Sequence, residues 1–439
     1  MKNIFFLILL LIISNLNSQA SIDCNSNLSI FAEYYKVKNY EAAYEPWMSV
    51  RKECPKINPA IYFQGSRMLE EFIKTSDGES KTAYQDDLLK LYDEWLINFP
   101  AYNGRSIVGQ IMSNKAQKMI DYKLATKTEI FDLFENAYQT DPVSFDDPKP
   151  LYNYFKTYFE LYKAGNGEIT LNQIFNKYEE LSERYNSIID EYSKKIDIII
   201  NKENSGVALT SREKRNKRVY EINSNASNIY LRNLNAIIAK ESTCENLIPL
   251  YRKNLEENKT NPVWLNRAAS RMDSKECSDD PLFVELVELL HNLNPSANSA
   301  YYLGLLNDKK GNNQEALNFY NESIDLETDN IKKARISYKI ATKFKNTKQF
   351  SKSRSYARSA LDFQPSLGRA YLLIANMYAD SANGCGDTQF NKRAVFWLAA
   401  QTAVKAGRVD ASLKKISDRT AAAFNGRAPT KTDIFTEGN

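Results

Sequence analysis

The side chains that could perform chemistry are few in this chain and far apart in its sequence. Its 439 residues include one histidine, His291, and five cysteines. Cys385 lies between two glycines in the stretch 382–387, where a thiol could be presented as a nucleophile. A cysteine nucleophile needs a neighbouring base, and His291 belongs to a different part of the chain. We therefore interpret Cys385 as an unpaired thiol in a turn.

Three pairs of adjacent carboxylates are the other candidates for catalysis or metal binding. They are Asp86 with Asp87, Asp146 with Asp147, and Asp279 with Asp280. Each pair is expected at the start of a helix, where negative charge complements the helix dipole and needs no catalytic role. The sequence thus predicts a protein that is not an enzyme and that has no catalytic, cofactor-binding or metal-binding residues.

A cluster of positive charge occurs at residues 211–218, where five basic side chains accompany one acidic residue, Glu213. One interpretation is a contact for an anionic lipid or an acidic partner. The other is a solvated helix start, in which Thr210 and Glu213 form a capping box, and we favour this second interpretation. The whole chain has 58 Lys and Arg against 54 Asp and Glu, so nucleic acid is not expected as a partner.

Regularly spaced prolines and small residues divide much of the chain into helical pairs. Proline cannot continue a helix, and it recurs where the second helix of a pair would end. The steps from Pro262 to Pro295 and on to Pro365 are 33 and 70 residues, which match one and two repeats. Within residues 297–365, the small residues Gly304, Ala316, Ala341 and Ala360 let helices approach, and Tyr320, Phe344 and Phe350 fill the space between pairs. Pro55, Pro100 and Pro142 extend the pattern towards the N-terminus.

Residues 26–142 and 244–406 resemble the tetratricopeptide repeat family on these motifs, and the first-helix signature recurs at Trp264 and at Tyr371. The resemblance implies an all-α fold, an α-α superhelix or tetratricopeptide-like solenoid, whose concave groove binds peptides or other proteins. The chain is similar to secreted tetratricopeptide proteins of Gram-negative cell envelopes. A repeat array of this kind carries no active site by default.

The resemblance also assigns candidate partner-binding residues, because the first helix of each pair lines the concave face in this family. The polar positions of these helices in the C-terminal repeats are Asn266, Arg267, Arg271, Asn307, Lys339, Lys343 and Asn376. They are expected to be exposed, so replacing Arg271, Lys339 and Lys343 together by alanine should hardly change stability. A merely solvated face would show the same residue types, and this alternative stays open.

A long hairpin is predicted between the two repeat blocks. From residue 171 onwards, apolar residues are spaced by three and four, which is typical of one long helix with a packed seam: Ile174, Tyr178, Leu181, Tyr185, Ile188, Tyr192, Ile196 and Ile199. After a turn containing Gly206, a second helix continues with Val219, Ile222, Ala226, Ile229, Leu234 and Ile237. Thirty helical residues span about 45 Å, so this inserted hairpin should project beyond the shorter pairs.

The N-terminus has the features of a secretory signal peptide: Lys2, an apolar run over residues 4–13, and small residues before the expected cleavage after Ala20. No later segment is apolar enough to span a membrane. The sequence predicts five segments: a signal peptide at 1–20, degenerate repeats at 21–145, the hairpin insertion at 146–243, C-terminal repeats at 244–425, and a disordered polar tail at 426–439. The expected locations are periplasmic, outer-membrane-associated or extracellular.

Cysteine positions within the repeats predict two disulfides. Cys24 and Cys54 lie at the two ends of the first helix pair, which an antiparallel arrangement brings together. Cys244 and Cys277 occupy equivalent turns of consecutive repeats, and such turns are neighbours in a solenoid. Buried unpaired thiols are the alternative, which an exported protein disfavours.

Two functions remain open at this point. The first is a non-catalytic exported scaffold or adaptor that binds a protein or peptide in its groove, with peripheral association to the envelope. The second is a glycan-binding, outer-membrane-associated protein built on tetratricopeptide-like helix pairs. The four tryptophans that could stack on sugars, Trp47, Trp95, Trp264 and Trp397, all fall at or near helix-packing positions, so we favour the first.

Overall fold

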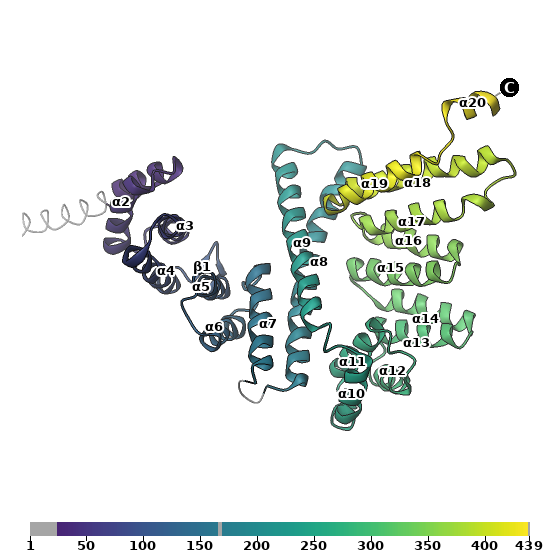
Figure 1. Cartoon of the computed structure of the whole chain (residues 1–439), viewed down its shortest axis with the longest axis horizontal. Coiled ribbons are helices and arrows are strands. Elements are labelled where there is room, and N and C mark those ends of the chain that lie inside the picture. The colour runs from purple at the N-terminus through teal and green to yellow at the C-terminus, as the bar shows by residue number, and fades with distance from the viewer. Residues whose placement is uncertain (1–23, 166–168, 438–439) are drawn as a thin grey trace, which may run out of the picture. The chain divides into compact units, whose positions relative to one another are not determined.

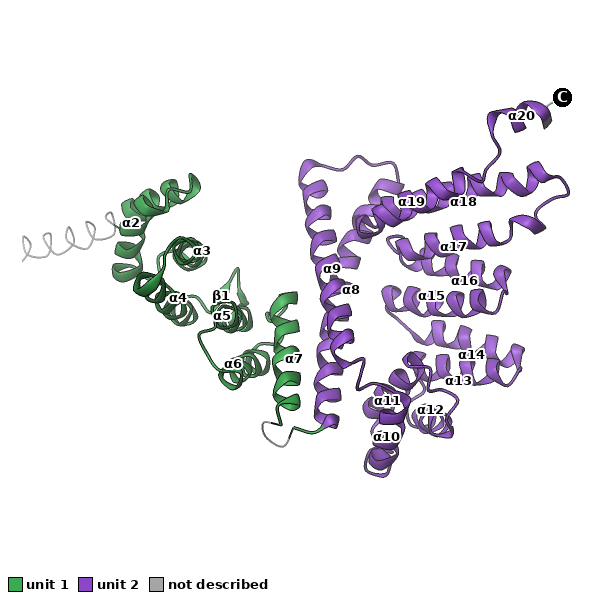
Figure 2. Ribbon diagram, viewed as in Figure 1, with its two compact units in different colours: residues 1–170 green, residues 171–439 purple. Residues whose placement is uncertain are grey.

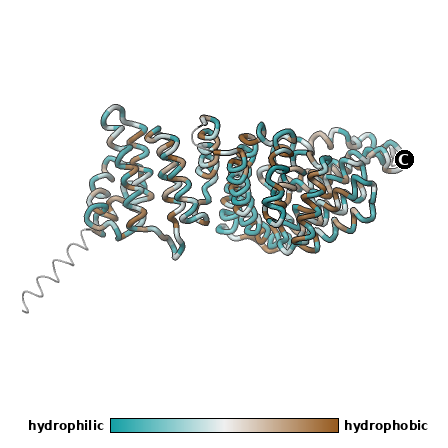
Figure 3. Tube along the Cα trace, turned by 90° about the horizontal axis from the view of Figure 1, so that it is seen from below, coloured by the Kyte–Doolittle hydropathy of each residue, from teal (hydrophilic) through white to brown (hydrophobic). Residues whose placement is uncertain are grey.

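The computed structural model describes residues 24–165 and 169–437, and the expected signal peptide at 1–20 lies outside the described residues (Figure 1). The chain forms two compact units, residues 1–170 and 171–439 (Figure 2). Both units consist almost entirely of α-helices, with hydrophobic and hydrophilic residues alternating along them, as expected for helices that are buried on one side (Figure 3).

The first unit consists of helices with one short hairpin of strands. Residues 24–36 are helical. The following elements are α2 (Tyr40–Glu53), α3 (Ala60–Thr75), α4 (Gly78–Asn98), β1 (Ala101–Tyr102), β2 (Arg105–Ser106), α5 (Val108–Tyr122), α6 (Lys127–Thr140) and α7 (Pro148–Lys163). Helices α3 and α4 form one packed pair, and α5 and α6 form the next. The two strands are antiparallel and are joined by Asn103 and Gly104, which both have positive φ as a tight hairpin turn requires.

A missing side chain explains the close packing of α2 on α3. Trp47 is fully buried and its indole nitrogen donates to the carbonyl oxygen of Ile61 at 2.7 Å. A Cβ atom at Gly65 would lie 2.5 Å from the Trp47 ring. The glycine therefore lets α3 approach the ring directly, and any larger residue there would have to displace it.

The second unit begins with two long helices, α8 (Leu171–Asn204) and α9 (Ser211–Ile238), and continues with short ones. These are α10 (Cys244–Asn258), α11 (Pro262–Ser274), α12 (Pro281–Leu293), α13 (Ala297–Lys309), α14 (Asn313–Leu326), α15 (Asn330–Asn346), α16 (Phe350–Phe363), α17 (Gly368–Asp380) and α18 (Gln389–Val409). The chain ends with α19 (Lys414–Asn425) and α20 (Lys431–Glu437), and two short 3-10 turns, η1 (Ala382–Gly384) and η2 (Ala411–Leu413), flank α18.

Successive helices of the second unit pack as pairs, α11 with α12, α13 with α14, α15 with α16, and α17 with α18. A Cβ atom at Gly304 of α13 would lie 2.5 Å from the ring of Tyr320 of α14, so glycine allows this close contact as Gly65 does for Trp47. Pro295 and Pro365 lie in the connections between pairs, and Pro262 is the first residue of α11. The predicted all-α fold and its tetratricopeptide-like helix pairs are thus confirmed.

The predicted hairpin is present and its first helix begins at Leu171 as the apolar spacing predicted, but the segment 146–243 assigned to it also contains another helix, and one of the seams differs. Residues 148–163 form the separate helix α7 of the first unit, whose Tyr154 packs against Phe134 of α6 with ring centroids 5.9 Å apart. The capping box of Thr210 with Glu213 begins α9 as predicted. The α8 seam is also as predicted, because Leu181, Tyr185 and Ile188 are buried.

The predicted α9 seam is wrong over its first part, whereas Leu234 is buried as predicted. Val219, Ile222 and Ile229 are 46%, 56% and 40% exposed, so they point away from α8. A less hydrophobic side of α9 packs on α8 instead, with the ring of Tyr220 6.1 Å from that of Tyr192 and Asn223 donating to the Tyr192 hydroxyl at 3.2 Å. The hydroxyl of Tyr192 thus has a partner in Asn223, as polar groups of packed aromatic residues usually do.

Two further expectations need correction. Asp147 and Asp280 are helix N-caps as expected, but Asp86 and Asp87 lie inside α4, where Asp87 pairs with Arg51 at 2.9 Å. Part of the polar tail is helical, because residues 431–437 form α20 and Asp433 pairs with Arg393 at 2.8 Å.

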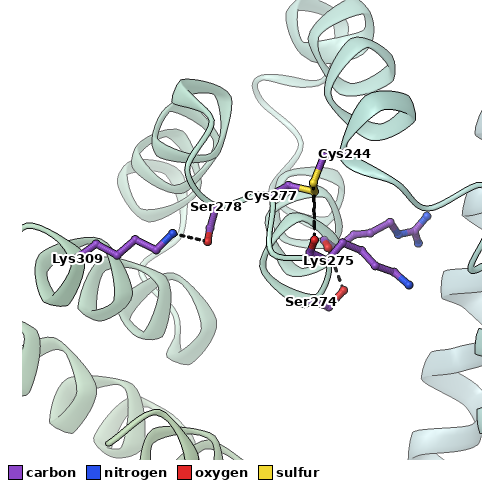
Figure 4. The surroundings of a disulfide bond; sticks show 7 residues. Cys244, Ser274, Lys275, Cys277, Ser278 and Lys309 are labelled. Atoms are coloured by element: carbon purple, nitrogen blue, oxygen red, sulfur yellow. Dashed lines mark hydrogen bonds between the residues drawn. A yellow bond between two sulfur atoms is a disulfide. The ribbon is translucent and has the colours of Figure 1, made fainter. Parts of the chain in front are cut away.

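The structure contains disulfides between the two cysteine pairs proposed from the sequence. Cys24 is bonded to Cys54, and Cys244 to Cys277, with Cα atoms 6.4 Å and 5.5 Å apart. The second bond ties the start of α10 to the turn between α11 and α12, and next to it Lys309 of α13 donates to Ser278 at 2.7 Å (Figure 4). No helix within the described ranges is both long and apolar enough to cross a membrane.

Candidate functional site

The inner face of the C-terminal repeats is occupied by the chain's own helix α8. This face is formed by the first helix of each pair, and Figure 1 shows α8 running alongside it. The side of α8 opposite the α9 seam is polar and faces the repeats; we call it the groove face of α8. It consists of Glu179, Glu183, Asn186, Asp190, Ser193 and Asp197, spaced by four, three, four, three and four residues.

Arg271 of α11 makes the most buried of these contacts. Only 4% of the residue is exposed, and its guanidinium forms an ion pair with Glu179. The guanidinium carbon also lies 4.3 Å and 4.9 Å from the ring centroids of Phe175 and Tyr178, both on α8. Burial lowers the pKa of Arg271 to about 10, which leaves it charged at neutral pH.

One turn closer to the N-terminus of α11, Arg267 donates two hydrogen bonds to Glu183, of 2.9 Å and 2.8 Å. This geometry is the two-pronged one that favours arginine over lysine. The hydrogen bonds to Glu183 raise the pKa of Arg267. The Glu183 side chain is 57% exposed, so the pair is far more accessible to solvent than that of Arg271.

The contact continues along α8 to the third and fourth repeat pairs. Asp190 pairs with Arg335 of α15, and Lys194 pairs with Asp329, the N-cap of α15. Asp197 accepts a hydrogen bond from the backbone amide of Ser366 at 3.0 Å, just before α17. Burial raises the pKa of Asp190 and Asp197, although their partners act in the opposite direction. Desolvation of these two carboxylates is therefore the larger effect.

The fit of α8 against the repeats is incomplete and leaves two cavities. The larger, about 840 Å³, is bounded by α8, α11, α13 and α15; the smaller, about 430 Å³, is bounded by α8, α9, α15 and the loop before α17. Asn186, Asp190, Arg335 and Lys339 line both cavities. Asn186, Asn266, Asn298, Ser182, Ser187, Ser270 and Tyr301 supply neutral polar groups to the larger one.

Lys339 of α15 places a positive charge between α8 and the repeats, next to both cavities. Its ammonium lies 5.2 Å from the ring centroid of Tyr301. Desolvation lowers the pKa of Lys339, while the nearby carboxylate of Asp273 counteracts this shift. Burial likewise raises the pKa of Asp273 against the influence of Lys339, Lys343 and Lys309.

The structure brings together some of the seven predicted partner-binding residues but not all. Asn266, Arg267 and Lys339 border the larger cavity, and Arg271 is buried against α8. Asn307 donates to the backbone of its own helix at 3.0 Å, and Lys343 lies 3.9 Å from Asp308. Asn307, Lys343 and Asn376 are not among the residues that border either cavity.

Two expectations about this site are wrong. The hairpin was expected to project beyond the shorter pairs, but α8 lies along them and is ion-paired to α11 and α15. Arg271 is not an exposed residue that can be removed without cost, because it is buried with a carboxylate as partner.

Sequence reasoning missed the acidic residues of α8, which are the main partners of the groove. A signal was available, because Glu179, Glu183, Asp190 and Asp197 follow one another at four, seven and seven residues and so share one side of a helix. The apolar seam on the opposite side explains the helix by itself, so the spacing of the acidic residues was not needed to predict it. A second polar stripe with helical spacing suggests that a helix is clamped between two neighbours.

The described residues offer little else for catalysis. Across 24–165 and 169–437, no three His, Cys, Asp or Glu side chains are grouped as a metal site would require. His291 shares a hydrogen bond of 3.0 Å with Ser299, and the Cys385 thiol lies 3.4 Å from the backbone oxygen of Ser381. The site is an assembly of ion pairs, amides and hydroxyls suited to binding.

Comparison with known proteins leaves the function of this site open. No family model and no curated protein matches the sequence. Among solved structures, a tetratricopeptide repeat protein from Parabacteroides merdae is 10% identical, covering 72% of this chain and 97% of its own, with a TM-score of 0.25. Yeast Tom70 is 12% identical, and the match covers 95% of this chain and 83% of Tom70, with a TM-score of 0.26.

A monomeric mutant of IFIT1, solved with Gppp-AAAA, is 13% identical, with coverages of 91% and 89% and a TM-score of 0.29. These are proteins that the chain is similar to, and scores this low give no information on what it binds.

Proposed function

We propose that this chain is an exported, non-catalytic helical-repeat scaffold that binds a protein partner on the inner face of its C-terminal repeats, in competition with α8. The observation that carries the proposal is the pairing of Arg267, Arg271 and Arg335 with carboxylates of the chain's own hairpin. A guanidinium engaged with one carboxylate cannot grip another in the same way. A partner for this face is therefore an acidic segment that takes the place of α8.

The character of the contact supports an exchange of this kind. Ion pairs that are partly open to water contribute little net stability, because desolvation offsets the attraction between the charges. The cavities of about 840 and 430 Å³ leave parts of this side of α8 without direct contact to the repeats. A polar and partly hydrated interface resembles those of proteins that associate reversibly more than it resembles a core.

The two disulfides support an oxidising compartment, since such bonds persist outside the cytosol. We infer a periplasmic, outer-membrane-associated or extracellular location, with peripheral association to the envelope and no cofactor. This inference agrees with the signal peptide expected at residues 1–20.

Glycan binding remains the second candidate, supported by the amides and hydroxyls around the larger cavity. The tryptophans argue against it because they pack against other rings. Trp95 stacks on Tyr62 with centroids 6.2 Å apart, and Trp264 meets Tyr251 edge-on at 5.7 Å. Trp47 is fully buried. Sugar recognition would need an accessible aromatic face in addition to hydrogen-bonding groups, so we favour a protein partner.

A cross-link between α8 and the start of α15 tests the proposal. Lys194 and Asp329, which form an ion pair there and are not among the three groove arginines, are replaced by cysteines in a Cys385→Ser background, and the two thiols are joined with a short bis-maleimide. The matched control is the same variant capped with N-ethylmaleimide, which has the same side chains removed but leaves α8 free to move.

We expect the capped variant to retain partner proteins from an envelope extract and the cross-linked variant to lose them, each measured by quantitative pull-down. Equal recovery by both forms would contradict groove binding and direct attention to other surfaces.

A further inference from the structure

Helix α9 has a second apolar side that its neighbours do not cover. Val219, Ile222, Ala226 and Ile229 follow one another at three, four and three residues and so lie along one side of the helix. Val219, Ile222 and Ile229 are 46%, 56% and 40% exposed. The opposite side, with Ser227, Leu234 and Ile238 buried, is the one that packs inward.

Positive charge continues this exposed side towards the hairpin turn. Arg212 and Arg215 precede Val219 at the same three- and four-residue spacing, and Arg218 lies beside them. We call Arg212, Arg215, Val219, Ile222, Ala226 and Ile229 the outer stripe of α9. The three arginines are exposed, or nearly so, and no ion pair is recorded for them within the described parts of the chain.

Two neighbouring lysines at the turn are ion-paired and occupy the carboxylates closest to these arginines. Lys202 pairs with Glu213 and Lys217 pairs with Glu203, each at 2.6 Å. Glu213 also caps α9 through the amide of Thr210 at 2.8 Å. The nearest acidic residues are thus committed to lysines and to the helix start, and the guanidinium groups are available for a partner.

We propose that the outer stripe of α9 docks an amphipathic helix of a partner protein, with acidic residues beside its own apolar seam. The stripe extends over about 27 Å, which is the length of a five-turn helix. Apolar positions alternating at three and four residues form the seam of two packed helices, and charges next to the seam select the partner. A partner with glutamates opposite Arg212, Arg215 and Arg218 complements both features.

A second copy of the same helix fits less well. A parallel copy would place its arginine end against this one, and like charges repel. An antiparallel copy with its apolar seam in register would place Arg212 and Arg215 opposite Ala236 and Asn233, neither of which is acidic. An anionic membrane also fits less well, because the apolar positions are short aliphatic side chains without the aromatic residues that anchor interfacial helices.

A synthetic peptide tests this docking independently of the groove. The probe is a helix of about three heptads with Ile and Leu along its seam and Glu at the flanking positions; the control peptide carries Lys in place of Glu. Binding of each to the full chain is followed by fluorescence anisotropy at low salt.

We expect the Glu peptide to bind the wild-type chain about ten-fold or more tightly than the Lys peptide. Ile222→Asn with Ile229→Asn should weaken the Glu peptide by a similar factor, and Arg212→Glu with Arg215→Glu and Arg218→Glu should reverse the preference. Circular dichroism checks that these variants remain folded. The matched control is Ile198→Asn on α8, a 71% exposed isoleucine outside the outer stripe, which should leave peptide binding unchanged.

Three results would overturn the proposal: no binding of the Glu peptide, equal binding of both peptides, or the same loss in Ile198→Asn as in the stripe variants. Binding to phosphatidylglycerol vesicles that depends on the outer stripe, without binding of the Glu peptide, would identify a membrane as the occupant instead. None of these results bears on whether α8 leaves the groove, so this test and that of the proposed function fail separately.

Discussion

The two sides of α8 use opposite chemistry to hold two neighbours. Towards α9 the helix presents Leu181, Tyr185 and Ile188, all buried. Towards the repeats it presents Glu179, Glu183 and Asp190, which are ion-paired and border cavities. Apolar burial stabilises strongly and without direction, whereas ion pairs define position and contribute less. The comparison suggests that the hairpin stays intact as a unit while its attachment to the repeats is the weaker contact.

The largest difference between the two sides should appear when an apolar residue is truncated. Tyr185→Ala removes a fully buried ring and should cost about 3 to 5 kcal/mol of unfolding free energy. Equilibrium urea denaturation measures the loss. Ile198→Ala on the same helix is the control and should change stability by about 0.5 kcal/mol or less, because its side chain is exposed. A loss below about 1 kcal/mol for Tyr185→Ala would show that the α9 seam is not the stronger contact.

Arg271→Ala should have the next largest effect, although it lies on the polar side. The change leaves Glu179 without its cation in a largely buried place, and should cost about 3 kcal/mol. Replacing both partners, Arg271→Met with Glu179→Gln, should recover most of the loss because no uncompensated charge remains. Thermal unfolding of the single and double variants provides the comparison. A double variant as unstable as the single one would mean that the ion pair makes a net stabilising contribution.

Glu183→Gln should have a small effect on stability, about 1 kcal/mol or less, because its partner Arg267 and its own carboxylate are partly exposed. The variant should nevertheless increase hydrogen exchange of the α11 surface at low salt. High salt should produce the same increase in the wild-type chain by screening the pair. Exchange that is insensitive to both would indicate that α8 is held mainly by other contacts.

Asp197→Asn should have the smallest effect and the opposite sign. Burial raises the pKa of Asp197 above its unfolded value, so the carboxylate destabilises the fold at pH values above its folded pKa. Below the unfolded pKa, both states are protonated and this cost vanishes. The asparagine keeps an acceptor for the amide of Ser366 and removes the charge. Denaturation at about pH 7 and about pH 3 should show a stability gain only at the higher pH. A gain of equal size at both values would rule out charge as the reason.

The repeats were predictable because their signals are local. Gly304 and Tyr320 are 16 residues apart, and the prolines between pairs act on the backbone at their own positions. The apolar seam of α8 was predictable for the same reason. The outer stripe of α9 misled the prediction because it is more apolar than the side that packs, where Asn223 donates a hydrogen bond to Tyr192 of α8 and Tyr220 contacts the same ring.

The candidate site depends on contacts that no local pattern reveals. Glu179 meets Arg271 across 92 residues, and Asp190 meets Arg335 across 145. Each charged residue alone is compatible with a solvated surface, and only the return of the chain brings the partners together. Asn266, Arg267 and Lys339 of the predicted set border the same cavity, whereas α8 was not predicted to lie beside it.

The attachment points of α8 also determine how the second unit responds to force. Arrays of stacked helix pairs are elastic, since each pair touches only its neighbours and small rotations accumulate along the array. Between Glu179 and Asp197, α8 bridges from the first of these pairs to the connection before α17, a span of about 27 Å along a continuous helix. Because α8 is attached at both ends of that span, it resists bending of the repeat array and keeps the curvature of the array constant. Detaching it would turn a stiff frame into a compliant one, so that a pull on the chain would be absorbed by the repeats instead of being passed on.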